Sequence, residues 1–269
     1  MINNPNYKYA SRRSATLGLN GTVATSNPLA ANAGLDMLKK GGNAVDAAVC
    51  AVSVLNVVEP MSTGVGGDVF ALVYDSKTKK IEALNGSGKS SIKTNIDDLR
   101  NLGMDSIPLE GPYSGVAVSI PGCVDAWDQL QKKFGVFSLD TVLVPAIDYS
   151  QNGFGVSEIT ANYWKISEKK LSINEKCEFL PNGRSPHFGE KVVLPDLNRT
   201  LKGISENGGH IFMKESSQKK FQNMFRSSTD GFVKKISLSI LVAGLDLFLQ
   251  ITEVMMYGNV LLMAKESLH

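Results

Sequence analysis

The first stretch of the chain whose residue types could form a binding site is the glycine-rich GVGGD at residues 64–68. Glycine-rich turns cradle phosphate when GKS or GKT and a helix follow them. Here the apolar, β-branched run Val69–Tyr74 follows instead, which predicts a strand. A tight turn that needs glycine is therefore favoured over a phosphate site.

Side chains for nucleophilic or metal chemistry are few and scattered. The histidines number three, so a Ser-His-Asp arrangement is hard to assemble: His187, His210 and His269. The cysteines also number three, with no CxxC pair: Cys50, Cys123 and Cys177. This spacing argues against a disulfide framework or a zinc site and predicts packed, reduced thiols. No cofactor or metal is expected.

Composition and charge are those of an ordinary soluble globular protein. The 269 residues are 43% apolar and 20% charged, and 28 Lys plus Arg against 26 Asp plus Glu give a net charge of +2. Without a basic block, binding to nucleic acid is not expected. Residues 1–13, MINNPNYKYASRR, lack the apolar stretch of a secretory signal, so we expect a cytoplasmic protein.

The first half of the chain predicts a strand, two helices and a hairpin. Residues 21–26 (GTVATS) are typical of a short buried strand. A helix then begins at Pro28, with Asn27 as N-cap and Leu29, Ala33, Leu35 and Leu38 as its apolar stripe, and ends at Gly41-Gly42. Residues 44–57 form a second helix, so apolar on all sides that it should be buried. Residues 69–74 and 81–84 form the hairpin.

The second half continues the mixture of helices and strands. Residues 116–120 predict a strand, and Pro121-Gly122 opens a helix that reaches Phe134 with Val124, Trp127, Leu130 and Gln131 on one side. Ser138 caps the next helix, and residues 157–170 and 196–206 also have helical patterns. This order favours an α/β or α+β fold over an all-α fold.

Four stretches together resemble one known family. They are residues 11–34, 39–75, 118–135 and 197–212, with GGNAVDAA followed by GxGGD and a strand as the most specific element. They are similar to the large-subunit part of the gamma-glutamyltransferases, also called gamma-glutamyltranspeptidases. The resemblance covers most of residues 7–212.

The resemblance implies an α+β fold, namely part of the four-layer αββα sandwich of N-terminal-nucleophile hydrolases. In that family a precursor cuts itself, and a threonine freed at the new N-terminus attacks a gamma-glutamyl or related acyl amide. The freed α-amino group can act as the base, so no histidine is required. The implied partners are a small-molecule amide and the small subunit of the same precursor.

One departure from the family pattern concerns the substrate. Family members that use glutathione carry an arginine just after the second hairpin strand, where its planar fork clamps a carboxylate. Here Ser87 stands at that place and Lys89 is the nearest cation. Both are our candidate substrate-binding residues, with a solvated loop as the alternative for Lys89. The pattern is similar to the branch with amidohydrolases and acylases, which puts glutathione in doubt.

After Phe212 the resemblance stops, and a shift of reading frame accounts for the residues beyond it. Residues 213–226 can be written in codons whose neighbouring frame gives YEGEFAEKISEYVQ, and residues 251–268 in codons giving NYRGYDVWECPPNGQGIAA. Both products resemble later family segments, in the family's order. We therefore interpret residues 1–212 as a large-subunit-like region and 213–269 as an out-of-frame tail without a native domain.

This interpretation leaves no catalytic residue in the chain, because the nucleophile belongs to the later half of the family precursor. The chain alone is expected to be inactive, as a truncated non-catalytic module or as a half that needs a separate small subunit. The apolar run 236–262 contains Asp246, Gln250 and Glu253, so a membrane span is not expected there.

Overall fold

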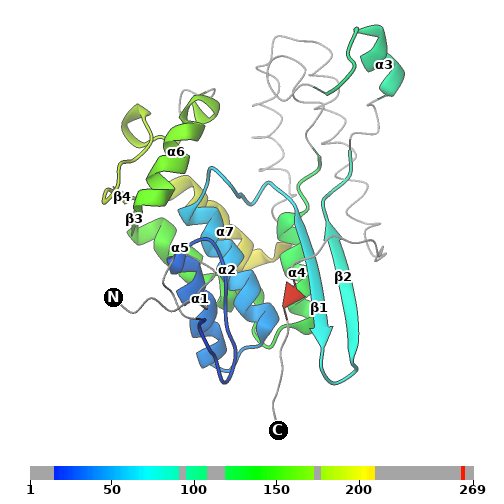
Figure 1. Cartoon of the computed structure of the whole chain (residues 1–269), viewed down its shortest axis with the longest axis vertical. Coiled ribbons are helices and arrows are strands. Elements are labelled where there is room, and N and C mark those ends of the chain that lie inside the picture. Colours follow the sequence, from blue (N-terminus) through cyan, green and yellow to red (C-terminus); the bar gives the residue numbers. More distant parts are fainter. Residues whose placement is uncertain (1–14, 91–94, 108–118, 173–176, 210–261, 264–269) are drawn as a thin grey trace, which may run out of the picture.

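The computed structural model describes residues 15–90, 95–107, 119–172, 177–209 and 262–263 (Figure 1). Its helices are α1 (Pro28–Lys39), α2 (Ala44–Val58), α3 (Ile96–Asn101), α4 (Cys123–Phe134), α5 (Leu139–Asn152), α6 (Glu158–Leu171) and α7 (Pro195–Asn207), with a 3₁₀ turn at Pro181–Gly183. Its strands are β1 (Val69–Asp75), β2 (Lys80–Gly86), β3 (Phe154–Gly155), β4 (Lys191–Val192) and β5 (Leu262–Met263). The described fold is thus a mixture of helices and strands, in agreement with the expected α+β class.

Helix α1 begins as the sequence predicts, but of its predicted apolar stripe only Ala33 is buried. The Asn27 side chain accepts a hydrogen bond from the Leu29 backbone N–H at 3.0 Å. The buried residues are Ala30, Ala33, Gly34 and Met37, whereas the predicted leucine stripe is only half-buried. The reason is close helix packing: a Cβ atom on Gly34 would lie 2.8 Å from the Ala47 carbonyl oxygen of α2. Small residues, not leucines, therefore face α2.

Helix α2 is buried nearly all round, as its apolar composition predicts. It lies against α1, α4 and α5, which places it at the centre of the helical layer (Figure 1). Its first turn carries a capping box, because Asn43 accepts from the Asp46 N–H while Asp46 accepts from the Asn43 N–H. The helix therefore has a fixed starting point in the fold.

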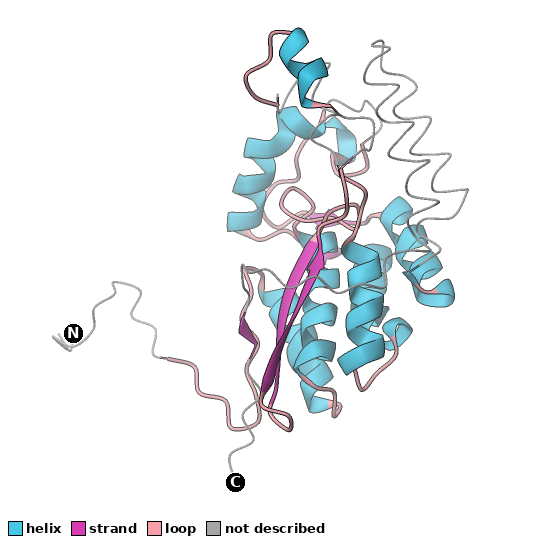
Figure 2. Cartoon of the chain, turned by 90° about the vertical axis from the view of Figure 1, so that its right-hand side faces the viewer, coloured by secondary structure: helices cyan, strands magenta, loops and turns pink. Residues whose placement is uncertain are grey.

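The predicted hairpin is confirmed. Strands β1 and β2 pair antiparallel from Val69↔Gly86 to Asp75↔Lys80, and β5 adds a short parallel pairing to β1 at Leu72↔Leu262 and Val73↔Met263. Helix α4 lies beside β2, and the two views agree on this arrangement (Figures 1 and 2). The helices thus cover one face of the hairpin.

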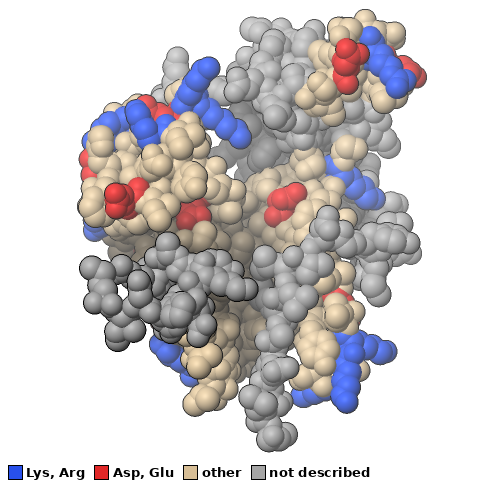
Figure 3. All heavy atoms as spheres, viewed as in Figure 1, with Lys and Arg blue, Asp and Glu red and all other residues tan. Residues whose placement is uncertain are grey.

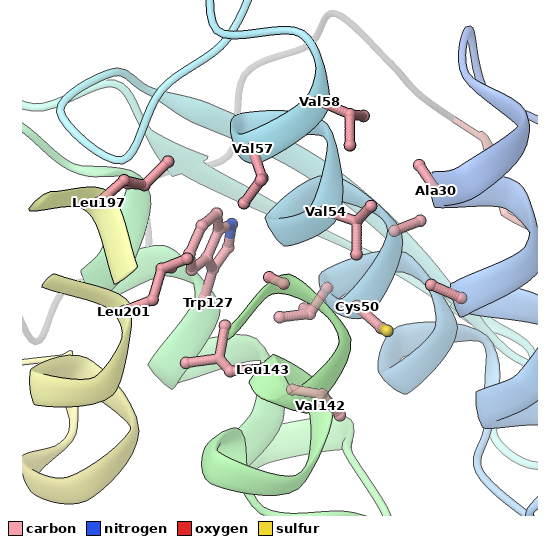
Figure 4. Close-up of a cluster of buried hydrophobic side chains, with 14 of the residues drawn as sticks. Ala30, Cys50, Val54, Val57, Val58, Trp127, Val142, Leu143, Leu197 and Leu201 are labelled. Carbon is pink, nitrogen blue, oxygen red and sulfur yellow. The ribbon is translucent and has the colours of Figure 1, made fainter. Parts of the chain in front are cut away.

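The core is centred on the fully buried Trp127 of α4. In Figure 4 its ring lies among Val57 of α2, Leu143 of α5, and Leu197 and Leu201 of α7. The face of α4 predicted from the sequence is the buried one: Val124, Trp127, Leu130 and Gln131. Six of the described helices therefore share one close-packed interior: α1, α2, α4, α5, α6 and α7.

Two segments predicted as strands are not strands where the structure describes them. Residues 21–26 are largely exposed and form no strand, so that prediction was wrong. Val23 packs against the helical core instead, and none of the described strands pairs with this segment. β-Branched residues fit a strand, but a strand also needs a partner. Of the strand predicted at 116–120, only Ser119 and Ile120 are described, and they are not in a strand.

Almost all of the predicted out-of-frame tail lies outside the described residues, including most of the apolar run 236–262, and so does Phe212, which precedes it. Within the described part of the chain, no helix is long and apolar enough to cross a membrane.

Candidate functional site at the end of the hairpin

Three loops meet where β1 begins and β2 ends. The turn at 64–68 precedes β1, the segment 86–89 follows β2, and the segment 119–122 leads into α4. The carbonyl oxygen of Gly67 accepts hydrogen bonds from the backbone N–H groups of Gly122 at 3.2 Å and Cys123 at 3.1 Å. The glycine-rich turn therefore satisfies the first donors of α4, which supports the tight-turn interpretation of GVGGD.

The segments 86–89 and 119–122 approach each other so closely that only glycine fits at the contacts. A Cβ atom on Gly88, whose φ is +73°, would lie 1.7 Å from the Ile120 carbonyl oxygen. One on Gly122 would lie 2.2 Å from the Gly86 carbonyl oxygen. The backbone of residues 86–89 is therefore held between the end of β2 and the start of α4.

Hydrogen bonds complete this attachment on both sides of Gly88. The Ile120 N–H donates to the Lys89 carbonyl at 2.9 Å, and the Ser119 hydroxyl donates to the Ser87 carbonyl at 3.1 Å. The Ser87 N–H donates to the Asn85 side-chain oxygen at 3.0 Å, which closes a tight turn. The loop thus has one defined backbone path.

The structure brings the predicted residues Ser87 and Lys89 together on this loop. Ser87 is half-buried, and its hydroxyl donates to the Gly88 carbonyl at 3.3 Å. Lys89 is exposed, and its ammonium group has no ion-pair partner among the described residues. A hydroxyl and an unpaired ammonium can both donate to an anionic or carbonyl oxygen, which suits binding rather than bond cleavage.

Groups that could attack a carbonyl are not activated in the described residues. Burial raises the pKa of the Cys50 thiol to about 12, and burial together with the Asp68 charge raises the pKa of Cys123 to about 12. A thiol with such a pKa is protonated near neutral pH and is a poor nucleophile. No described Ser, Thr or Cys side chain hydrogen-bonds to the side chain of a histidine or lysine, although the Ser185 hydroxyl donates to the Glu168 carboxylate at 2.5 Å.

The element of the sequence that resembles the family most, GGNAVDAA, turns out to be structural. Asp46 is completely buried, and its carboxylate accepts from Asn43 N–H at 2.6 Å, Gln131 Nε2 at 2.9 Å, Val136 N–H at 3.1 Å and Phe137 N–H at 3.1 Å. It therefore joins the start of α2 to the loop between α4 and α5. The sequence shows Asp46 as a lone charge on an apolar helix, but not its distant partners.

The hairpin face that points away from the helices is apolar. Val69, Ala71 and Val73 of β1 pack on the helical core, so their neighbours along the strand face the other way. Those outward positions and their partners on β2 are Phe70, Leu72, Tyr74, Ile81, Ala83 and Asn85. Phe70 is 47% exposed and Ile81 is 55% exposed. We call this set the outer sheet face.

Other surfaces offer less chemistry. A crevice of about 340 Å³ lies between β2 and the end of α4, lined mainly by apolar residues and crossed by the Lys133–Glu82 ion pair. The described residues contain no cluster of His, Cys, Asp and Glu that could hold a metal. On the face shown in Figure 3, Lys and Arg form separate groups rather than one continuous basic surface.

Comparison with known proteins gives relatives of similar sequence. The chain is 35% identical over 212 residues to the glutathione hydrolase proenzyme of Bacillus subtilis, and 39% identical over 203 residues to the glutathione hydrolase-like YwrD proenzyme of the same species. These alignments cover 78% and 74% of the chain but 36% and 37% of the relatives. The chain therefore spans little more than a third of the length of these relatives.

Solved structures share the fold. The cephalosporin acylase of Bacillus halodurans has a TM-score of 0.73 and 35% identity, over 88% of this chain and 45% of that one. The Helicobacter pylori gamma-glutamyltranspeptidase has a TM-score of 0.71 and 25% identity, over 85% of this chain and 65% of that one.

The family model named gamma-glutamyltranspeptidase matches residues 30–227, which is most of the chain. This match ends beyond the frame break that we predict at Phe212, and the position of that break remains a prediction. The α+β arrangement, the relatives and the family match agree: the chain belongs to the gamma-glutamyltranspeptidase family.

Proposed function

We propose that this chain is the large-subunit-like part of an enzyme that hydrolyses or transfers a gamma-glutamyl or related acyl amide. In this proposal the chain supplies one helical layer, one sheet and the loop 86–89. The nucleophile, an N-terminal threonine in the family reaction, comes from the small-subunit part. The chain alone then has no turnover.

The outer sheet face is the observation that carries the proposal. A soluble domain rarely leaves a large apolar sheet face uncovered, so a second layer is needed to bury it. In the four-layer αββα sandwich that we propose, another sheet packs on it. Phe70 and Ile81, both about half exposed in the described structure, then become part of the interior.

The loop 86–89 is proposed to hold the acyl part of the substrate. It lies at the edge of the outer sheet face, directly after the last β1–β2 pair, Val69↔Gly86. Ser87 and Lys89 supply donors, but neither gives the two parallel donors of a guanidinium. We therefore propose weak selection for the α-carboxylate of glutathione and a wider range of acyl amides, as the acylase relatives suggest.

Co-expression tests the proposed function. The chain is produced together with the remaining C-terminal portion of the Bacillus subtilis YwrD relative, beyond the region that the chain matches. We expect the two to co-purify and to release p-nitroaniline from a gamma-glutamyl or glutaryl anilide. The double variant Phe70→Lys, Ile81→Lys should abolish co-purification, with Lys77→Glu at the exposed hairpin turn as the control. Failure of the unmodified pair to associate or to turn over either anilide would reject the proposal.

The second candidate is a stable non-catalytic module. The closed core around Trp127 favours it, because six of the described helices already bury a common interior without the second sheet. A cooperative urea transition of the purified chain, together with no association in the co-expression test, would select this alternative.

The interpretation of residues 213–269 as an out-of-frame tail and the expected cytoplasmic location remain part of the proposal. Nucleotide sequence across the codons of residues 205–215 tests the frame. We expect a downstream open frame with homologous coding sequence and a threonine at a self-cleavage site.

A further inference from the structure

The contact between segments 86–89 and 119–122 is built from separate interactions that converge on one short stretch of backbone. A hydroxyl from Ser119 holds the Ser87 carbonyl, and a backbone N–H from Ile120 holds the Lys89 carbonyl. Between these two bonds, Gly88 is in the left-handed region and leaves no room for a side chain. The loop is therefore fixed at three consecutive residues, which is more than a solvated loop requires.

We propose that Ser119 and Gly88 are positioning residues for substrate binding: they set where Ser87 and Lys89 meet the acyl group. This inference rests on the proposed function. Ser119 acts through the Ser87 carbonyl and so needs no contact with the substrate. Gly88 acts by allowing the loop to lie against Ile120, because any larger residue would push the two segments apart.

The two candidate binding side chains differ in how much they depend on this attachment. Lys89 has a long, exposed side chain that can adapt to small shifts. Ser87 has a short side chain, so its hydroxyl moves with the backbone. Displacement of the loop should therefore affect affinity for the substrate more than the rate of a chemical step that takes place on the other subunit.

The test uses the co-expressed complex and four variants. Ser119→Ala removes the hydroxyl, Ser119→Thr retains it, Gly88→Ala introduces the clash, and Gly155→Ala is the control, since a Cβ atom there meets nothing within 4 Å. We expect Ser119→Ala to raise KM about threefold to tenfold, the factor that one ordinary hydrogen bond is worth. Its kcat should change by less than about twofold, a conservative limit for a group that binds substrate and transition state equally. Ser119→Thr should restore KM, and Gly88→Ala should raise it further.

Amide hydrogen exchange on the 269-residue chain alone gives a second measurement that needs no turnover. The Ile120 N–H and the Ser87 N–H should exchange faster in Ser119→Ala and Gly88→Ala but not in Gly155→Ala. Unchanged KM in an active complex would overturn the inference even if exchange increased, because the contact would then be merely structural. An inactive unmodified complex would instead reject the proposed function, and this inference with it.

Discussion

The buried Asp46 network and the 86–89 loop are two polar regions with opposite surroundings. Asp46 has no exposed surface, and donors from the N-cap of α2, from α4 and from the loop after α4 surround its carboxylate. Lys89 is exposed, and its ammonium group has no ion-pair partner among the described residues. In the first region the side chain is fixed and serves the fold, whereas in the second the backbone is fixed and the side chains are available.

Under the proposed function, this difference separates the residues that hold the family fold from those that select a substrate. In the GGNAVDAA element, which carries the resemblance to the family, Asn43 and Asp46 each have several hydrogen-bond partners in the fold. The loop after β2 keeps a glycine-dependent backbone while its side chains differ from the glutathione-type pattern. A fold can therefore persist while its substrate changes.

The largest effect is expected at Asp46. Asp46→Ala leaves several buried N–H donors without an acceptor, and each such group costs about 1–3 kcal/mol. We expect a loss of at least about 3 kcal/mol in the free energy of unfolding, measured by urea denaturation. Asp36→Ala, which removes only an exposed pair with Lys39, should change it by less than about 0.5 kcal/mol. Equal losses at Asp46 and Asp36 would contradict the structural role of the buried Asp46 carboxylate.

Close packing of α1 on α2 predicts an intermediate effect at Gly34. Alanine usually stabilises a helix by about 1 kcal/mol relative to glycine. At Gly34, however, its Cβ atom would lie 2.8 Å from the Ala47 carbonyl oxygen, so we expect a net loss of about 1–3 kcal/mol. Gly203→Ala in α7, where a Cβ atom meets nothing within 4 Å, is the matched control and should stabilise. Thermal unfolding of both variants measures the contrast, and a stabilised Gly34→Ala would contradict the packing.

A third polar region, which is partly exposed, predicts a small dependence on pH. Hydrogen bonds from Ser185 and Lys165 lower the pKa of Glu168 to about 2, and Arg184 with the His187 N–H lowers the pKa of Glu190 to about 2. Because both values lie below the ordinary 4.5, the stabilisation is complete above that pH and is lost as the pH falls from 4.5 through 2.

Hydrogen exchange at pH 6 and pH 3 should therefore show faster opening of residues 183–190 at the lower pH, while α2 stays protected. Arg184→Gln should move the onset for Glu190 to higher pH. Loss of protection in α2 at the same pH would show that the exposed and buried networks do not act separately.

The smallest effect on stability is expected at the two candidate binding residues. Ser87→Ala and Lys89→Ala remove side chains that hold no other element in place, so each should change the free energy of unfolding by less than about 0.5 kcal/mol. Both should still raise KM in the co-expressed complex. A large loss of stability in either variant would show that the side chain stabilises the fold, as the Asp46 carboxylate does.

The sequence predicted the helices and the hairpin because their signals are local. Asn27 and Asn43 cap helices that begin one residue later, and both caps are present. The strand predicted at 21–26 was wrong because pairing depends on a partner distant in the sequence. The short elements α3, β3 and β4 were not predicted, since two-residue strands and a six-residue helix carry almost no periodicity.

The candidate site was predictable only in part. The resemblance pointed to Ser87 and Lys89, and the structure places them on one loop. It did not point to Ser119 or to the contact of Gly88 with Ile120, because both join segments that are distant in the sequence. Ser119, whose hydroxyl donates to the Ser87 carbonyl, is separated from Ser87 by 32 residues. Likewise, Asp46 is separated by 85 residues from Gln131. Long-range backbone contacts leave no pattern in a single sequence.

We propose that this chain binds the substrate and that the small-subunit part supplies the nucleophile. The most direct test is the release of p-nitroaniline from a gamma-glutamyl or glutaryl anilide by the purified 269-residue chain alone. We predict no release above the uncatalysed rate, because in the proposed function the described residues only bind and position the substrate and the nucleophile comes from the small-subunit part. Turnover by the chain without a partner would contradict this prediction.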